Sequence, residues 1–171
     1  MRIFLTNLGK YNEGELLGQW LKLPCSDSQL KATLKAIGIG EEYEETFITD
    51  YENDYGFEIN EYDSLTLLNE IAEGISDLTD NEKKLLCAVL EREYHSLYQM
   101  QGILDSLGEY HLCPNVTDHE ELGNYYIHEL EHHDLDKMGE LANYLDYEAY
   151  GRDIDFNSSG GFTSHGWLER R

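Results

Sequence analysis

Positively charged residues are scarce in this sequence of 171 residues, which has 12 Lys plus Arg against 35 Asp plus Glu. The formal net charge is therefore −23 at pH 7. Nucleic-acid-binding proteins need a basic surface that displaces counterions from phosphates, so this chain is not expected to bind nucleic acid. An anionic membrane surface would repel it as well.

Long apolar runs and cysteine pairs are also missing. The first residues, Met-Arg-Ile-Phe-Leu-Thr-Asn, contain only three consecutive apolar residues. A secretory signal needs roughly 7–15 such residues and a membrane span needs about 20. The three cysteines, Cys25, Cys87 and Cys113, are odd in number and follow neither a disulfide nor a zinc-binding pattern. We therefore expect a reduced, soluble, cytoplasmic protein.

Proline is rare, but apolar and aromatic residues are not. Hydrophobic residues make up 40% of the chain and aromatic residues 12%, including 13 Tyr. Disordered acidic chains are poor in aromatic residues, so this composition predicts a folded protein that carries its charge on the surface. The length has room for one ordinary domain or two to three small modules.

Apolar periodicity and capping residues predict an α+β fold with antiparallel strands. Strands are expected at residues 2–7, 17–23, 45–51, 109–113, 152–157 and 162–168, the last two joined by a hairpin turn at 158–161. The aromatic spacing in the third of these also allows a helix, but its β-branched centre favours a strand. Helices are expected behind Ser26, Ser64 and Thr79, over residues 95–107, and in stretches from a capping box at Thr117–Glu120 to about Tyr147.

Changes in element type suggest where the modules meet. The sequence predicts an N-terminal α+β module (1–61), a helical module (62–106) and a C-terminal α+β module (107–171). No internal repeat is evident.

The sharpest match to a catalytic motif is His-Glu-Leu-Glu-His at residues 128–132, which has the H-E-x-x-H spacing of zinc metalloproteases. On an α-helix, His128 and His132 would share one face and bind zinc while Glu129 activates water. The extended metzincin pattern is broken, because Leu and Met stand where it needs Gly and His. We favour a solvated helix face, with a zinc-dependent hydrolase as an alternative.

The negative charge is concentrated in the sequence. No Lys or Arg occurs between Ala36 and Glu82, which hold 15 acidic residues. Residues 41–63, here called the acidic tract, contain 10 acids interleaved with aromatic residues. Interleaving lets apolar side chains anchor the backbone while carboxylates project outward. Such a surface is either a solvated face, a halophile's surface or a polyanion for a basic partner.

Four segments follow the order in which a known family carries them: Phe4–Gly14 with Gly18–Trp20, Phe47–Glu52, the motif Leu141–Ile154, and Gly161–Trp167. Together they resemble the ArdA-type antirestriction proteins, the DNA mimics of plasmids, conjugative transposons and phages. The resemblance implies an elongated, three-module α+β homodimer whose carboxylates trace the phosphates of bent B-form DNA. It also implies a partner, the DNA-binding groove of type I restriction–modification enzymes, and a role in protecting incoming mobile DNA without catalysis or a cofactor.

The carboxylates expected to imitate phosphates lie in the acidic tract, in the segment after it, in the 141–154 motif and, for Asp155, just beyond this motif. They are Glu41, Glu42, Glu44, Glu45, Asp50, Glu52, Asp54, Glu58, Glu61, Asp63, Glu70, Glu73, Asp77, Asp146, Glu148, Asp153 and Asp155. No metal site is expected, His128 and His132 being the residues that the zinc alternative would use. A second alternative is an acidic decoy for another basic DNA-binding protein.

Overall fold

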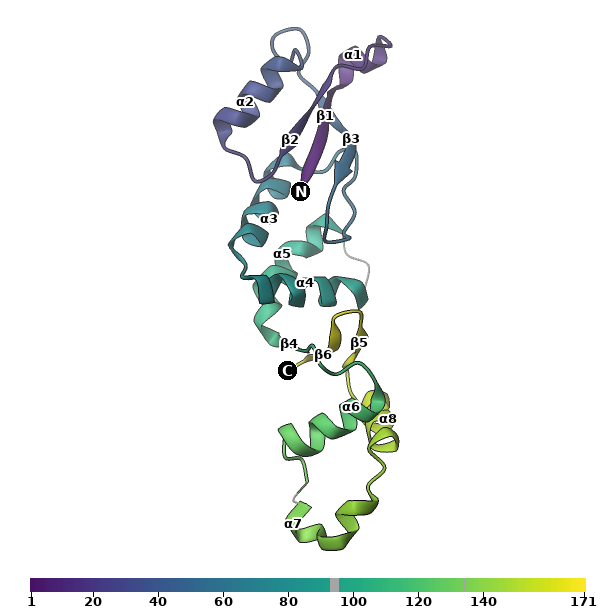
Figure 1. Cartoon of the computed structure of the whole chain (residues 1–171). Helices are drawn as coiled ribbons and strands as arrows, with labels where there is room; N and C mark the ends of the chain where they lie inside the picture. Colours follow the sequence, from purple (N-terminus) through teal and green to yellow (C-terminus); the bar gives the residue numbers. More distant parts are fainter. Residues whose placement is uncertain (93–95, 134) are drawn as a thin grey trace. The chain divides into compact units, whose positions relative to one another are not determined.

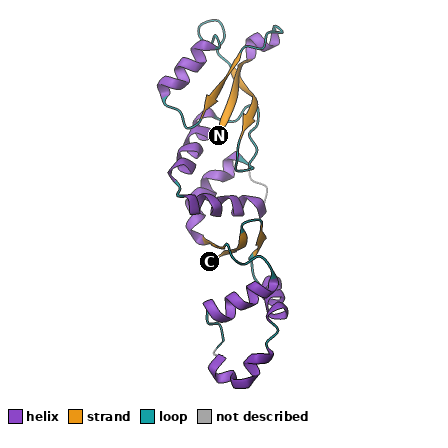
Figure 2. Cartoon of the chain, viewed as in Figure 1, coloured by secondary structure: helices purple, strands orange, loops and turns teal. Residues whose placement is uncertain are grey.

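The computed structural model describes residues 1–92, 96–133 and 135–171 (Figure 1). The chain divides into two compact units: unit 1 (Met1–Lys83 and Tyr94–Asp105) and unit 2 (Lys84–Glu93 and Ser106–Arg171). Figure 2 shows helices and strands in both parts of the chain, and in the described residues the strands form two antiparallel three-stranded sheets. The predicted α+β class is therefore confirmed. The three-module division stays a prediction.

Unit 1 is built on a sheet with the strand order β2-β1-β3. Its elements, in chain order, are β1 (Arg2–Asn7), α1 (Leu8–Asn12), β2 (Gly18–Lys22), α2 (Asp27–Ala36), β3 (Thr46–Glu52), α3 (Leu65–Asp77), the start of α4 (Asp80–Arg92), and α5 (Leu97–Ser106). The central strand β1 carries the fully buried Ile3 and Leu5. The three strands predicted here are confirmed.

Three helices, α2, α3 and α4, begin where the capping residues predict, whereas the short helix α1 was not predicted. The Ser26 side chain accepts from the Gln29 backbone at the start of α2, and Gln29 returns a hydrogen bond to the Ser26 backbone. Ser64 caps α3 by accepting from the backbone N–H of Leu67. Thr79 and Glu82 form the reciprocal capping box expected before α4. The expected start of α5 at His95 lies outside the described residues.

Unit 2 contains most of α4 and a sheet with the order β4-β6-β5. Its other elements are the 3-10 helix η1 (Leu107–Glu109), β4 (Tyr110–Cys113), α6 (His119–Asn124), the π-helix η2 (Tyr125–Glu129), α7 (Leu135–Met138), the 3-10 helix η3 (Gly139–Tyr144), α8 (Tyr147–Asn157), β5 (Gly161–Thr163) and β6 (Gly166–Arg170). A buried cluster of Cys113, Val116, Leu122 and Trp167 forms its core, against which Ile154 packs.

The predicted strand at residues 152–157 is wrong, because these residues belong to α8. The local alternation of Ile154 and Phe156 imitates a strand, yet Phe156 is 88% exposed and only Ile154 packs on the core. The helix starts at Asp146, whose carboxylate accepts from the backbone N–H of Ala149. The hairpin predicted around residues 158–161 is therefore wrong as well. The hairpin of the structure joins β5 to β6.

The capping box predicted at Thr117–Glu120 is displaced by one residue. Asp118 is the N-cap of α6 and accepts from the backbone N–H of Glu121. Glu121 in turn accepts from the backbone and hydroxyl of Thr117. The helical stretches expected from here to about Tyr147 are α6, η2, α7 and η3, and the backbone has a positive φ of 49° at Glu131, after η2.

No described helix is long and apolar enough to cross a membrane.

Candidate functional site: the acidic surface

The acidic tract consists of β3 and the loop segments on either side of it. Its apolar anchors Phe47, Ile48, Phe57 and Ile59 are between 3% and 6% exposed. Beyond β3, the Asn53 amide donates to the carbonyl of Phe57 at 2.8 Å, which fixes the loop. The acids between these anchors face solvent, as the interleaved sequence predicts. The carboxylates therefore project from a backbone that is held in place from below.

Of the 17 carboxylates predicted to imitate phosphates, all are exposed except Asp63 and Asp155, which are half-buried. Exposure is necessary for a partner to reach them. Some of these carboxylates also form hydrogen bonds or ion pairs with other residues of the chain, which compensate their charge.

Within and just after the acidic tract, several of these carboxylates have internal partners. The Arg2 guanidinium donates to Glu52 through two nitrogens, and these hydrogen bonds lower the pKa of the Glu52 carboxyl. Asp63 accepts from the backbone N–H of Asn60 at 2.8 Å, which fixes the loop. Glu73 accepts a 3.3 Å hydrogen bond from Asn69. Glu52 is thus neutralised rather than free to imitate a phosphate.

In the 141–154 motif and just beyond it, three of the four predicted carboxylates also have partners. Asp146 caps α8, Glu148 lies 3.7 Å from Arg152, and Asp155 contacts His119 at 3.0 Å. These three carboxylates therefore have a structural role within the fold.

Nine of the predicted carboxylates make no hydrogen bond or ion pair with any described residue. They are Glu41, Glu42, Glu44, Glu45, Asp54, Glu61, Glu70, Asp77 and Asp153. Six of the nine belong to the acidic tract. Its first four glutamates line an open cavity of about 350 Å³ together with Leu8, Gly9, Asn12 and Tyr43. The largest group of uncompensated charge therefore sits at the start of the tract.

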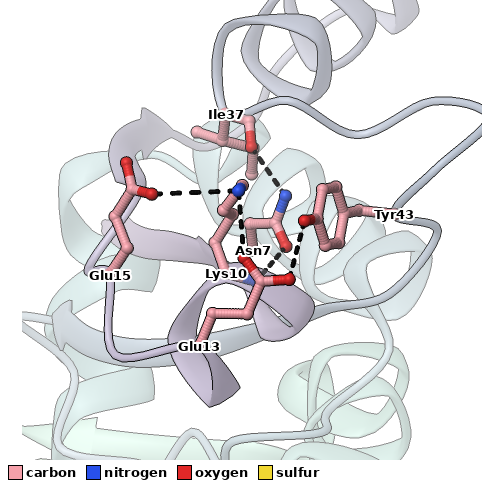
Figure 3. Close-up of polar contacts among 6 residues, drawn as sticks. All are labelled: Asn7, Lys10, Glu13, Glu15, Ile37 and Tyr43. Carbon is pink, nitrogen blue, oxygen red and sulfur yellow. Dashed lines mark hydrogen bonds and ion pairs between the residues drawn. The ribbon is translucent and has the colours of Figure 1, made fainter.

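A polar cluster around α1 holds the start of the tract in place (Figure 3). The buried Asn7 donates to the carbonyl of Ile37 at 2.9 Å and caps α1 by accepting from the backbone N–H of Lys10. The Lys10 ammonium contacts Glu13 at 3.0 Å and lies 4.9 Å from the centre of the Tyr43 ring. The Tyr43 hydroxyl also donates to Glu13, at 2.8 Å. Tyr43, which is flanked in sequence by the four glutamates, thus holds this segment against Lys10 and Glu13 of the α1 region.

The protonation states within this cluster favour its geometry at neutral pH. The hydrogen bonds from Lys10 and then Tyr43 lower the pKa of Glu13, while the hydrogen bond to Glu13 raises the pKa of Tyr43. Gly9 is required beside them, because a Cβ there would lie 2.2 Å from the Tyr43 ring. This anchoring role of Tyr43 was not predicted from the sequence. Gly9 and Lys10, which contact Tyr43, do lie in the Phe4–Gly14 segment that resembles the family.

The helix α8, which begins within the 141–154 motif, packs against α6 at two glycines, Gly151 of α8 and Gly123 of α6. A Cβ on Gly151 would lie 1.8 Å from the carbonyl oxygen of His119, and a Cβ on Gly123 would lie 2.0 Å from that of Tyr147. Only glycine allows the two backbones to come this close. The motif therefore contains the contact that sets the spacing of α6 and α8.

Tyrosines of the motif also contact the histidines that follow α6. The Tyr147 hydroxyl lies 3.0 Å from Nε2 of His128, and the Tyr150 hydroxyl lies 3.0 Å from Nε2 of His133. His132 instead packs its ring edge-on against Tyr126. Because residues 125–129 form the π-helix η2 and Glu131 has a positive φ, residues 128–132 lack the regular α-helix that the zinc alternative needs. No group of three His, Cys, Asp or Glu side chains in the described ranges could hold a metal ion.

Glu91, near the end of α4, binds the turn of the C-terminal hairpin. Its carboxylate accepts from the Ser164 hydroxyl at 2.8 Å and from the Ser164 backbone N–H at 2.9 Å and 3.0 Å. These hydrogen bonds lower the pKa of Glu91 below its ordinary value of 4.5. Because the folded pKa is the lower one, the stabilisation is complete above the unfolded pKa and is lost as the pH falls through the folded pKa.

We expect Glu91→Gln to lower the melting temperature at neutral pH, with a difference from the parent protein that shrinks between about pH 5 and pH 3. Thermal unfolding followed by circular dichroism across this range measures it. Glu140→Gln, at an exposed carboxylate of the same unit, is the control and should behave like the parent. A Glu91→Gln difference that stays constant with pH would contradict the assigned role.

A comparison with known families tests the resemblance drawn from the sequence. The family model described as antirestriction protein (ArdA) matches residues 3–169. The chain belongs to the ArdA family of antirestriction proteins. No match was found among curated proteins. The ArdA match spans the α1 cluster, the acidic tract and the glycine contact between α6 and α8, so all three features lie within the family region.

Proposed function

We propose that this ArdA protein is a DNA mimic that occupies the DNA-binding groove of type I restriction–modification enzymes and thereby protects incoming mobile DNA. It acts in the cytoplasm as a homodimer, without catalysis or a cofactor. The observation that carries the proposal is the set of exposed tract carboxylates, Glu41, Glu42, Glu44, Glu45, Asp54 and Glu61, that no described residue neutralises.

The number of acidic side chains can be compared with the number of phosphate charges on a given length of DNA. B-form DNA carries about one negative charge per 1.7 Å of its axis, so the 35 acidic side chains would match at most about 17 base pairs, or about 60 Å. The six uncompensated carboxylates of the tract correspond to about three base pairs. A two-fold dimer, which the family resemblance implies, would double both figures.

The same physics explains why one inhibitor serves against enzymes that read different sequences. Contacts to phosphates position a protein on DNA but carry no sequence information. A mimic of the phosphate charges therefore competes with any target sequence. Long-range attraction to the basic groove speeds association and weakens as salt screens it.

The two alternatives make different predictions. An acidic decoy for another basic DNA-binding protein would bind such proteins as tightly as it binds a restriction enzyme. A zinc-dependent hydrolase would contain stoichiometric zinc after purification, yet His128 already contacts Tyr147 and His132 packs on Tyr126.

A restriction-protection assay tests the proposed function in cells. In bacteria carrying a type I restriction system, expression of this chain should raise the plating efficiency of unmodified phage by about two orders of magnitude or more. The same phage carrying methylated sites is the control and should plate equally with and without the protein. Unchanged restriction at confirmed expression would contradict the proposal.

A further inference from the structure

Unit 1 contains a cavity of about 400 Å³ beside the end of β2. The apolar residues Leu23, Ala72 and Ile75 that line it are 4%, 5% and 5% exposed. Lys22 and Lys83 also line it, although the chain as a whole has a net charge of −23. Two of the few basic residues therefore line one cavity, together with apolar residues.

Neither lysine is neutralised by a residue that the structure describes. Lys22 and Lys83 make no ion pair with any described residue, although 35 acidic residues are present. Lys10, in contrast, contacts Glu13, and Arg2 contacts Glu52. The two cavity lysines thus retain uncompensated positive charge where most of the surface is negative.

Lys83 also occupies a position that local electrostatics disfavours. It lies near the N-terminus of α4, where the helix dipole is positive and favours acids rather than bases. Lys22 lies directly opposite Arg2 in the pairing of β1 with β2, but Glu52 compensates the charge of Arg2 and leaves that of Lys22. A negative charge held at the cavity would offset the dipole cost at Lys83 and pair with Lys22.

We infer that this cavity binds a small organic anion, with its phosphate or carboxylate group at Lys22 and Lys83 and its apolar body against Leu23, Ala72 and Ile75. The volume lies within the range of about 300–1,000 Å³ that is typical of small-molecule sites. The Ser76 hydroxyl at the same cavity adds a hydrogen-bond donor for the anionic group. An inorganic ion would leave the apolar wall unused, so the organic part contributes to the affinity.

Methyl NMR of the full chain tests this site through Ala72 and Ile75. Adenosine monophosphate, octanoate and inorganic phosphate are titrated separately. Adenosine monophosphate adds an organic part to a phosphate group, octanoate joins an alkyl chain to a carboxylate group, and inorganic phosphate has no organic part. At least one of the two organic anions should shift these methyl signals saturably, and should bind about tenfold or more tightly than phosphate. Binding of neither organic anion, or binding no tighter than phosphate, overturns the inference.

Lysine variants separate this site from general attraction between ions. The double variant Lys22→Gln and Lys83→Gln should weaken binding at least about tenfold, while Lys31→Gln and Lys35→Gln together should change it less than about twofold. Both pairs lower the net charge equally, and Lys31 and Lys35 lie on α2 outside the cavity lining. Circular dichroism confirms that each variant is folded. Equal losses in the two double variants would contradict the inference.

Discussion

Gly151→Ala is expected to unfold unit 2 at temperatures where the parent protein remains folded. The new methyl carbon would lie 1.8 Å from the carbonyl oxygen of His119, so α6 and α8 must separate. Overpacking of this kind costs about 3 kcal/mol or more when backbone rather than a flexible side chain stands in the way. For a unit of this size the melting temperature should fall by about 10 °C or more.

Gly102→Ala is the matched control, because Gly102 is an exposed helix residue in α5 and a Cβ there meets nothing within 4 Å. Alanine is the better helix former by about 1 kcal/mol, so this change should leave the melting temperature unchanged or raise it. Thermal unfolding by calorimetry compares the two variants. A Gly151→Ala protein as stable as Gly102→Ala would show that the glycine contact does not set the packing of α8.

The second large effect is expected at the start of the acidic tract. Changing Glu41, Glu42, Glu44 and Glu45 to glutamine together should weaken inhibition of a type I methyltransferase by about 10- to 100-fold. Each exposed ionic contact is worth about 0–1 kcal/mol, so the single change Glu44→Gln or Asp54→Asn should cost less than about fivefold. The melting temperature should not fall, because removing like charges reduces self-repulsion.

A variant with the same net charge but with changes elsewhere separates the tract from the charge as a whole. Glu129, Glu131, Asp136 and Glu140 are exposed acids of unit 2 outside the predicted set. Their conversion to amides should reduce inhibition several-fold less than the tract variant does. Equal losses would assign the effect to net charge alone. Complete loss from Glu44→Gln in a folded protein would contradict a distributed surface.

Much of unit 1 was predictable because α2, α3 and α4 each carry a start signal in the sequence, whereas α1 was not predicted. Ser26, Ser64 and Thr79 precede apolar residues at helical spacing, and their side chains cap the helices as expected. Residues 152–157 were predicted wrongly, although Asp146 caps α8 in the same way. Their local alternation favours a strand, whereas the helix is fixed by the contact of Gly151 with the distant carbonyl of His119.

The candidate site shows the same division between local and long-range information. The interleaving of acids with apolar anchors predicted exposed carboxylates, and the tract has them. Which of them are neutralised depends on residues far apart in sequence: Arg2 reaches Glu52 across 50 positions. Tyr43 meets Glu13 across 30 positions, which no local pattern indicates.

The central claim, that exposed carboxylates replace DNA phosphates, is tested most directly by competition for a type I methyltransferase. Fluorescence anisotropy follows a labelled DNA duplex bound to the enzyme while this protein is titrated in. The account predicts complete displacement of the duplex at about 50 mM salt, and an inhibitory concentration that rises tenfold or more at about 300 mM. A duplex that stays bound at low salt in the presence of excess folded protein would contradict the account.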